Sequence, residues 1–279
     1  MPAWPAPYRD ILAVVTTMAP WSQTAEVGAN LAARWESVLT GCFMAPSLRT
    51  LAANDAKPPV ASLLCEYSTA SADAPTRADF GAFANHRGVH YSRWTVAQSD
   101  LSHTLRRLGA WHDLAILDRD VTEPMRLFNV LGEALLSSRI PCLILPPQTE
   151  VAPPFKRVAI GWNGRPQAIH AVHAALPILA AAKQVCILDG ASDQTASHDG
   201  LPSFDPYSYL AMHGIVAQSH TIHADASSIG TALLEESRDM QADLLVMGAY
   251  GHATSQARRF GGATRHVLAQ APLPVLMRH

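Results

Sequence analysis

The sequence carries the same series of segments twice, and this internal repeat constrains the fold more than any other feature. Four segments of the first half have counterparts in the second half, in the same order. The pairs are Tyr8–Val14 with Phe155–Gly161, Gly88–Val96 with Gly214–Ile222, Ala110–Ile116 with Met240–Val246, and Pro141–Ile144 with Pro274–Met277. Each match is weak alone, but the shared order indicates a duplication.

Short apolar runs alternate with amphipathic stretches along both halves. The runs are Ile11–Val15, Val38–Met44, Val89–Val96, Leu114–Leu117, Cys142–Leu145, Val158–Gly161, Val185–Leu188, Ile215–Ile222, Leu244–Met247 and Val275–Met277. Runs this short, bounded by Gly, Pro or Asp, predict buried strands. Between them, Thr24–Glu36 and Ser228–Met240 place apolar residues on one helical stripe. The alternation predicts an α/β fold with two doubly wound, mostly parallel five-stranded sheets, each covered by helices on both faces.

Paired prolines mark the joint between the halves. Pro146-Pro147 and Pro153-Pro154 separate the last apolar run of the first half from the first run of the second. Such pairs stiffen a connector and cannot continue a central strand. We therefore expect two domains, residues 1–150 and 151–279, in agreement with roughly 150 residues per domain. The first half also carries a long stretch, Ser47–His86, in which we expect one or two helices and a surface segment.

Composition excludes several classes of function. With 48% hydrophobic and 16% charged residues, the chain can form cores and is not extensively disordered. Its 21 Lys and Arg against 23 Asp and Glu give a net charge of −2, which disfavours nucleic acid as a partner. No apolar run reaches the roughly 18 residues of a membrane span, and no secretion signal is visible. None of the four cysteines forms a C-x-x-C pair, so we expect reduced thiols and a cytoplasmic location.

The chemistry-bearing segment follows the run Leu244–Met247. Gly248 and Gly251 come directly after that run, and Gly261-Gly262 begin a helical pattern. Glycine lets backbone amides approach an anion, and a helix N-terminus favours phosphate. The carboxyl ends of parallel strands are also where α/β sheets bind ligands, so the pattern indicates a two-sided phosphate cradle. The same glycines are equally consistent with tight turns alone, and the pattern by itself leaves both interpretations open.

This segment resembles the universal stress protein family. Nucleotide-binding members carry Gly, two residues, Gly, nine residues, Gly, and then Ser or Thr after the fourth strand. Gly248 and Gly251 match the first pair, and residues 252–260 lead to Gly261, which matches the next glycine. The following position, which holds a hydroxyl residue in the family, is Gly262 here, and Thr264 matches a second hydroxyl position.

The resemblance extends beyond the motif. Val158–Gly164 is similar to the family's first strand and turn, and Ala271–Leu276 to its last strand. Residues 151–279 thus resemble one such domain and the first half a second, degenerate one, which implies a tandem chain of Rossmann-like, adenine nucleotide alpha hydrolase-like domains. In related proteins the last strands pair to make a dimer. The resemblance implies that Cys142–Leu145 and Val275–Met277 imitate that dimer within one chain, and a further homodimer stays open.

The resemblance also assigns a site, with two departures from the family pattern. The family places an Asp after the first strand to recognise adenine, whereas this sequence has Asn163 in the second half and Thr16 in the first. Asp118 occupies the first-half position that matches Gly248, and a carboxylate repels phosphate. We therefore expect a nucleotide site only in the second half, formed by Asn163, Gly248, Gly251, His252, Gly261, Gly262 and Thr264. Trp162 either stacks on the adenine or packs in the core.

The implied function is regulation of a stress response through ATP or another adenine nucleotide, with Mg²⁺, and through protein partners that the sequence does not identify. An alternative is a scaffold that binds no nucleotide and acts through protein contacts alone. A third hypothesis is slow nucleotide hydrolysis. The sequence contains no P-loop, no Gly-x-Ser-x-Gly and no His-Glu-x-x-His, so we expect no catalytic residues, no metal site and no enzyme.

Overall fold

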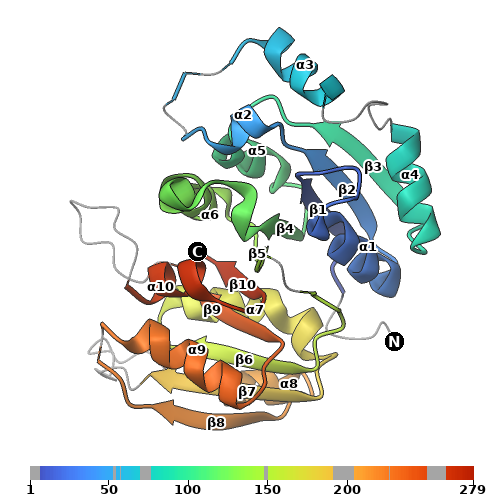
Figure 1. Ribbon diagram of the computed structural model, residues 1–279. Helices are drawn as coiled ribbons and strands as arrows, with labels where there is room; N and C mark the ends of the chain where they lie inside the picture. Colours follow the sequence, from blue (N-terminus) through green and yellow to red (C-terminus); the bar gives the residue numbers. More distant parts are fainter. Residues whose placement is uncertain are drawn as a thin grey trace. The chain divides into compact units, whose positions relative to one another are not determined.

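The computed structural model describes residues 7–52, 55–56, 58–69, 77–147, 150–190, 204–225, 227–249 and 262–279. The chain divides into two compact units, Pro7–Pro153 and Pro154–His279, which we call the N-terminal and the C-terminal unit. Both units alternate strands with helices (Figure 1).

The N-terminal unit contains a five-stranded parallel sheet with the order β3-β2-β1-β4-β5. Its strands are β1 (Asp10–Val15), β2 (Val38–Phe43), β3 (Tyr91–Val96), β4 (Leu114–Asp118) and β5 (Cys142–Leu145). Its helices are α1 (Gln23–Trp35), α2 (Pro46–Arg49), α3 (Val60–Thr69), α4 (Arg77–His86), α5 (Leu101–Leu108) and α6 (Glu133–Ser138), with short turns η1 (Arg119–Val121), η2 (Pro124–Arg126) and η3 (Phe128–Gly132).

The C-terminal unit has the same parallel strand order, β8-β7-β6-β9-β10. Its strands are β6 (Arg157–Trp162), β7 (Gln184–Gly190), β8 (Ala217–Ile222), β9 (Leu244–Gly248) and β10 (Val275–Arg278). Its described helices are α7 (Pro166–Leu179), α8 (Pro206–Met212), α9 (Ile229–Asp239) and α10 (Gly262–Gln270). In Figure 1, α9 passes in front of this sheet and α7 behind it, as expected when the direction of winding reverses.

These observations confirm the predicted fold class. Every predicted apolar run contains or overlaps one strand. The prediction that all of them are buried is wrong for the edge strands β3 and β8, since only the inner strands are covered on both faces. The residues of β1 from Ile11 onward are fully buried, whereas the edge strand β8 is largely exposed. The predicted run Ile215–Ile222 begins two residues before β8. No helix within the described ranges combines the length and apolar character that crossing a membrane requires.

The stretch Ser47–His86 differs from the expectation of one or two helices, because α2, α3 and α4 all fall in or at the start of it. The four-residue α2 is too short to show a helical period in the sequence, and it begins with Pro46, whose fixed φ suits a first helical position. The helix α4 buries Phe80 and Ala84, four residues apart, on the face that packs on β3.

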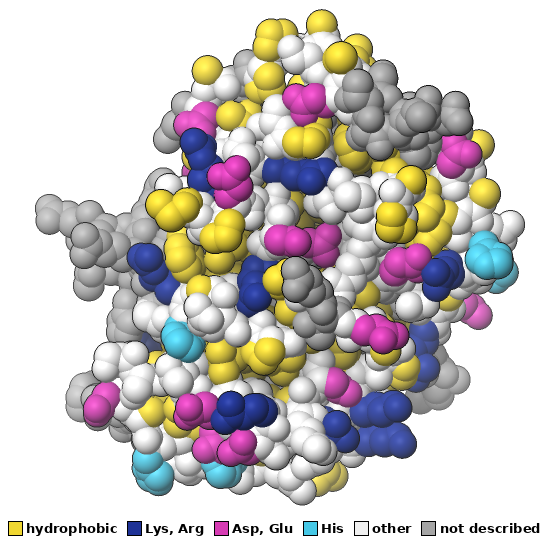
Figure 2. Space-filling model, in the orientation of Figure 1, with side chains coloured by type: hydrophobic (Ala, Val, Ile, Leu, Met, Phe, Trp, Pro, Cys, Tyr) yellow, Lys and Arg dark blue, Asp and Glu magenta, His cyan; other side chains and the backbone are white. Residues whose placement is uncertain are grey.

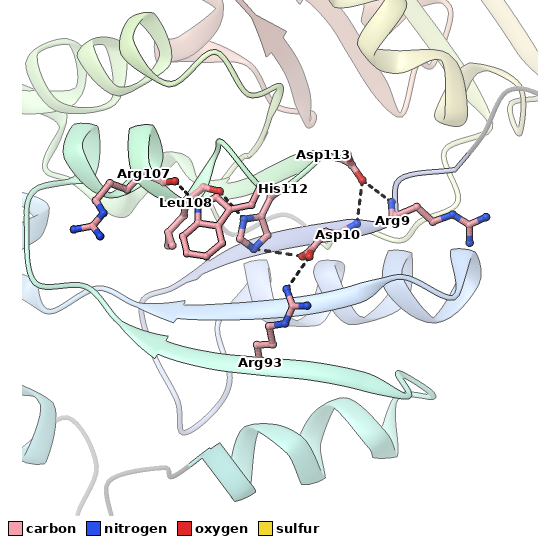
Figure 3. Close-up of polar contacts among 8 residues, drawn as sticks. Arg9, Asp10, Arg93, Arg107, Leu108, His112 and Asp113 are labelled. Atoms are coloured by element: carbon pink, nitrogen blue, oxygen red, sulfur yellow. Dashed lines mark hydrogen bonds and ion pairs between the residues drawn. The ribbon is translucent and has the colours of Figure 1, made fainter.

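The amino ends of both sheets are closed by the same carboxylate arrangement, which Figure 3 shows for the N-terminal unit. In each unit an aspartate just before the fourth strand accepts two successive backbone N–H groups at the start of the first strand. Asp113 binds Arg9 and Asp10 at 2.7 and 3.0 Å, and Asp243 binds Lys156 and Arg157 at 2.7 and 2.9 Å. These residues occupy matching positions of the sequence repeat, so the two units share this contact as well as the strand order.

The variant Asp113→Ala should lower the free energy of unfolding by about 1–3 kcal/mol, because it removes two hydrogen bonds to a charged acceptor at once. Urea denaturation measures the change. Asp239→Ala is the matched control, because Asp239 is 71% exposed and pairs only with its neighbour Arg238 among the ion pairs of the described residues. The control should change stability by less than about 0.5 kcal/mol. Equal effects of the two variants would contradict the proposed role of Asp113.

Candidate functional site

The carboxyl edge of the C-terminal sheet has the topology of a ligand site. β6 pairs with β7 on one side and with β9 on the other, so the winding reverses between β6 and β9. Ligands of open α/β sheets bind at this reversal, outside the carboxyl ends of the strands. The register pairs Gly161 with Met247, which brings the residues that follow both strands to the same edge. Asn163 and Gly248, both predicted as site residues, therefore share this edge.

Gly248 lies against the first turn of α7. A Cβ atom at this position would lie 2.6 Å from the backbone nitrogen of Ala168 and 2.6 Å from the carbonyl carbon of Gln167. Both neighbouring atoms belong to the backbone and cannot rotate away, so any larger residue would displace α7. Packing against α7 therefore requires glycine here, and sequence reasoning had considered only the approach of phosphate or a tight turn.

Asn163 is exposed and follows β6 directly. Its side-chain oxygen Oδ1 accepts the backbone N–H of Arg165 at 3.2 Å. An asparagine that binds the backbone two residues onward forms a compact local turn. This turn holds the side-chain amide at the carboxyl edge, just before α7 begins.

The predicted phosphate-binding residues are only partly described. α10 begins at Gly262, which is exposed, and because α10 connects two parallel strands its N-terminus lies at the carboxyl edge. Thr264, in the first turn, is only 4% exposed, so its side chain faces inward rather than toward solvent. Gly251, His252 and Gly261 lie outside the described residues.

Trp162 is 8% exposed, and its ring centroid lies 5.9 Å from that of Phe204. Of the two interpretations of this residue, packing is the one that these contacts support. Phe204 also contacts Tyr209, which stacks on His173 at 4.4 Å. Burial and the nearby positive charges of other histidines and Arg278 lower the pKa of His173. Sequence reasoning missed this aromatic group, because its members come from segments far apart in the chain.

The matching edge of the N-terminal unit is bridged by side chains. The hydroxyl of Thr16, after β1, donates to Oδ2 of Asp118, at the end of β4, at 3.3 Å. Arg49 reaches across from α2, where its Nε donates to the carbonyl oxygen of Met44 at 2.8 Å and its Nη2 donates to that of Thr16. Asp118 is 7% exposed, and its burial, with the nearby charge of Asp120, raises its pKa to about 7.

The two edges therefore offer different chemistry. In the N-terminal unit Thr16 and the buried carboxyl of Asp118 occupy the reversal point, with the guanidinium of Arg49 beside them. The C-terminal unit has Asn163 and Gly248 at the positions that match Thr16 and Asp118. Asp118 was expected to oppose phosphate, but Arg49 was missed, because nothing in the sequence links it to Thr16. Among the described residues, no group of three or more His, Cys, Asp or Glu side chains could hold a metal ion. Figure 2 shows positive and negative side chains interspersed on the face that it displays.

Comparisons with known proteins agree with the fold. The model of the Universal stress protein family matches residues 154–279. A universal stress protein from Archaeoglobus fulgidus DSM 4304 is similar in structure, with a TM-score of 0.67, 13% identity, and coverage of 96% of this chain and 97% of that chain. A functionally unknown protein from Pseudomonas aeruginosa PAO1 has a TM-score of 0.60 and 11% identity, over 97% of this chain and 92% of that chain. At these identities the likeness shows the fold alone. No curated protein matches the chain.

Proposed function

Through residues 154–279 this chain belongs to the universal stress protein family, and from that premise we propose that it regulates a stress response by binding an adenine nucleotide, ATP with Mg²⁺, in its C-terminal unit. The observation that carries the proposal is the contrast at the two reversal points. A buried carboxyl, Asp118, stands in the N-terminal unit where the C-terminal unit has Gly248. Side chains of Thr16, Arg49 and Asp118 bridge the first of these positions, whereas Gly248 places no side chain at the second.

Each proposed contact follows from simple chemistry. The Asn163 amide offers a donor and an acceptor to the edge of a base. The first amides of α10, from Gly262 onward, favour the phosphates because they are unpaired within the helix and lie at the positive end of its dipole. From the sequence motif we add Gly251, His252 and Gly261, with Thr264 as a residue of the first turn of α10. We propose binding without turnover, in which occupancy changes the surface offered to protein partners.

Isothermal titration calorimetry with ATP and Mg²⁺ tests the proposal, and we expect one nucleotide per chain. Gly251→Asp should weaken binding by 100-fold or more, because a carboxylate in the cradle repels the phosphates and removes hydrogen bonds to them. This fold-change corresponds to a loss of roughly 3 kcal/mol of binding free energy. Ser219→Asp, on the exposed edge strand β8, adds the same charge elsewhere and should leave binding unchanged. Absence of binding by the wild type, together with no nucleotide in mass spectra of the denatured protein, would refute the proposal.

A scaffold that binds no nucleotide is the second candidate, and the packing of Gly248 favours it. That glycine is required by α7 whether or not a phosphate binds. Affinity purification with wild-type and Gly251→Asp baits separates the two functions. Partners that depend on the nucleotide should be lost from the Gly251→Asp bait. Unchanged partners, with no nucleotide on the wild-type bait, would favour the scaffold.

A further inference from the structure

The first turns of α9 and α10 touch each other at Gly230. This glycine is the second residue of α9, and its neighbour Ala263 is the second residue of α10. A Cβ atom at Gly230 would lie 3.1 Å from Cα and 3.2 Å from the carbonyl oxygen of Ala263, and 2.7 Å from Cβ of His266. All three are atoms of the α10 backbone or directly attached to it. No side-chain rotation relieves these contacts, so a methyl group at Gly230 would have to move the helix itself.

We infer that Gly230 is a positioning residue for phosphate binding: its missing side chain sets where the first turn of α10 lies. The inference rests on the proposed nucleotide site, because the amides of that turn are the ones assigned to the phosphates. Hydrogen bonds weaken over a few tenths of an ångström beyond about 3.2 Å, so a small displacement of the turn matters.

The remaining contacts of α10 explain why the displacement would reach its N-terminus. Thr264, Val267 and Leu268 are buried, which holds the inner face of the helix. On the side of α9, Thr231 Oγ1 and His266 Nε2 lie 3.3 Å apart in a hydrogen bond. A methyl group inserted at Gly230 acts between this bond and the first residue of α10, Gly262, which is exposed, so this end of the helix is the part that yields.

The N-terminal unit offers an internal comparison. α5 follows β3 as α9 follows β8, and the second residue of α5 is Ser102, which is buried and carries a Cβ. The second position of the corresponding helix, which holds Gly230 in the C-terminal unit, is therefore a serine in the N-terminal unit.

The test compares ATP with adenosine in wild-type and Gly230→Ala protein. We expect the variant to bind ATP on the order of tenfold more weakly, which corresponds to the loss of one hydrogen bond to a charged group, and to bind adenosine as the wild type does. A purely structural defect would weaken both ligands alike. Gly81→Ala, on α4, is the matched control, because the nearest atom to its added Cβ is Ser92 Oγ at 3.9 Å. It should change neither affinity.

Two further measurements make the outcome decisive. The double variant Gly230→Ala/His266→Gly removes the 2.7 Å contact and should recover part of the ATP affinity. The backbone amide signals of Gly262, Ala263 and Thr264 in NMR spectra should shift in Gly230→Ala and stay in place in Gly81→Ala. A folded Gly230→Ala protein with wild-type ATP affinity or unmoved α10 amides would overturn the inference. If the wild type binds no ATP, the proposed function fails, and with it the role in phosphate binding, while the amide signals still decide whether Gly230 places the helix.

Discussion

As the pH rises from 3 to 8, the stability of Asp118→Asn relative to the wild type should increase by on the order of 4 kcal/mol. Stability is the free energy of unfolding, and the predicted quantity is the change in the difference between the two proteins. The cause is the pKa of Asp118, which burial and the charge of Asp120 raise from its ordinary value of 3.8 to about 7. Asparagine has nearly the same shape and still accepts the Thr16 hydroxyl, but it never ionises.

The sign follows from which state loses its proton first. Between pH 4 and pH 7 the carboxyl ionises in the unfolded chain but stays protonated in the folded one, so rising pH favours unfolding. The contribution to stability is complete below the unfolded pKa and is lost as the pH rises through the folded value. Urea denaturation of both proteins from pH 3 to pH 8 measures it. Asp120→Asn, which removes only the second cause, should produce a smaller change in the same direction. Parallel stability curves for Asp118→Asn and the wild type would contradict the assignment.

Phe80→Ala should lower the free energy of unfolding by about 3–5 kcal/mol, the usual cost of removing a buried aromatic ring. Phe80 is fully buried, and its ring centroid lies 4.9 Å from that of Trp94 and 5.5 Å from that of Trp21. The ring also fills the space above Gly41, where an added Cβ would lie 2.6 Å from it. The cavity left by alanine is therefore enclosed on several sides and cannot collapse easily.

Phe83→Ala provides the control for Phe80→Ala. Phe83 belongs to the same aromatic cluster and the same helix but is only partly buried. Its loss should cost roughly half as much or less, because neighbouring side chains and water can fill the gap. Chemical denaturation followed by tryptophan fluorescence reports on both variants. A Phe80→Ala protein as stable as Phe83→Ala would show that α4 does not depend on this ring.

The inner strands could be predicted because a strand that is buried on both faces requires apolar residues along its whole length. β1, β2 and β4 are apolar over nearly their whole length, and these runs are visible without any knowledge of the fold. The number of helices in the stretch Ser47–His86 could not be predicted, because α2 is too short to show a helical period. The position of α2 over the sheet edge depends instead on the hydrogen bond from Arg49 to the carbonyl oxygen of Thr16, 33 positions away in sequence.

For the candidate site, the sequence predicted which residues follow the strands β6 and β9 but not how they pack. Asn163 and Gly248 lie at the same edge, as expected from strands that end together. The reason for a glycine at 248, the contact with α7, depends on tertiary structure that no local pattern shows. The role of Gly230 has one signal in the sequence, because a glycine within an otherwise regular helical stretch often has a packing reason. The assignments of Gly251, His252 and Gly261 stay predictions from the motif.

Asp113 and Asp243 make equivalent contacts in the two units, which indicates which parts of each unit the fold requires. In both units these bonds tie the start of the first strand to the residue that precedes the fourth strand. At the carboxyl edge the two units differ, because side chains are hydrogen-bonded across it in the N-terminal unit, whereas the C-terminal unit has Gly248 there. A new ligand site could therefore be designed in the N-terminal unit by changing the loops that follow its strands, while the residues at the amino ends of the strands are kept.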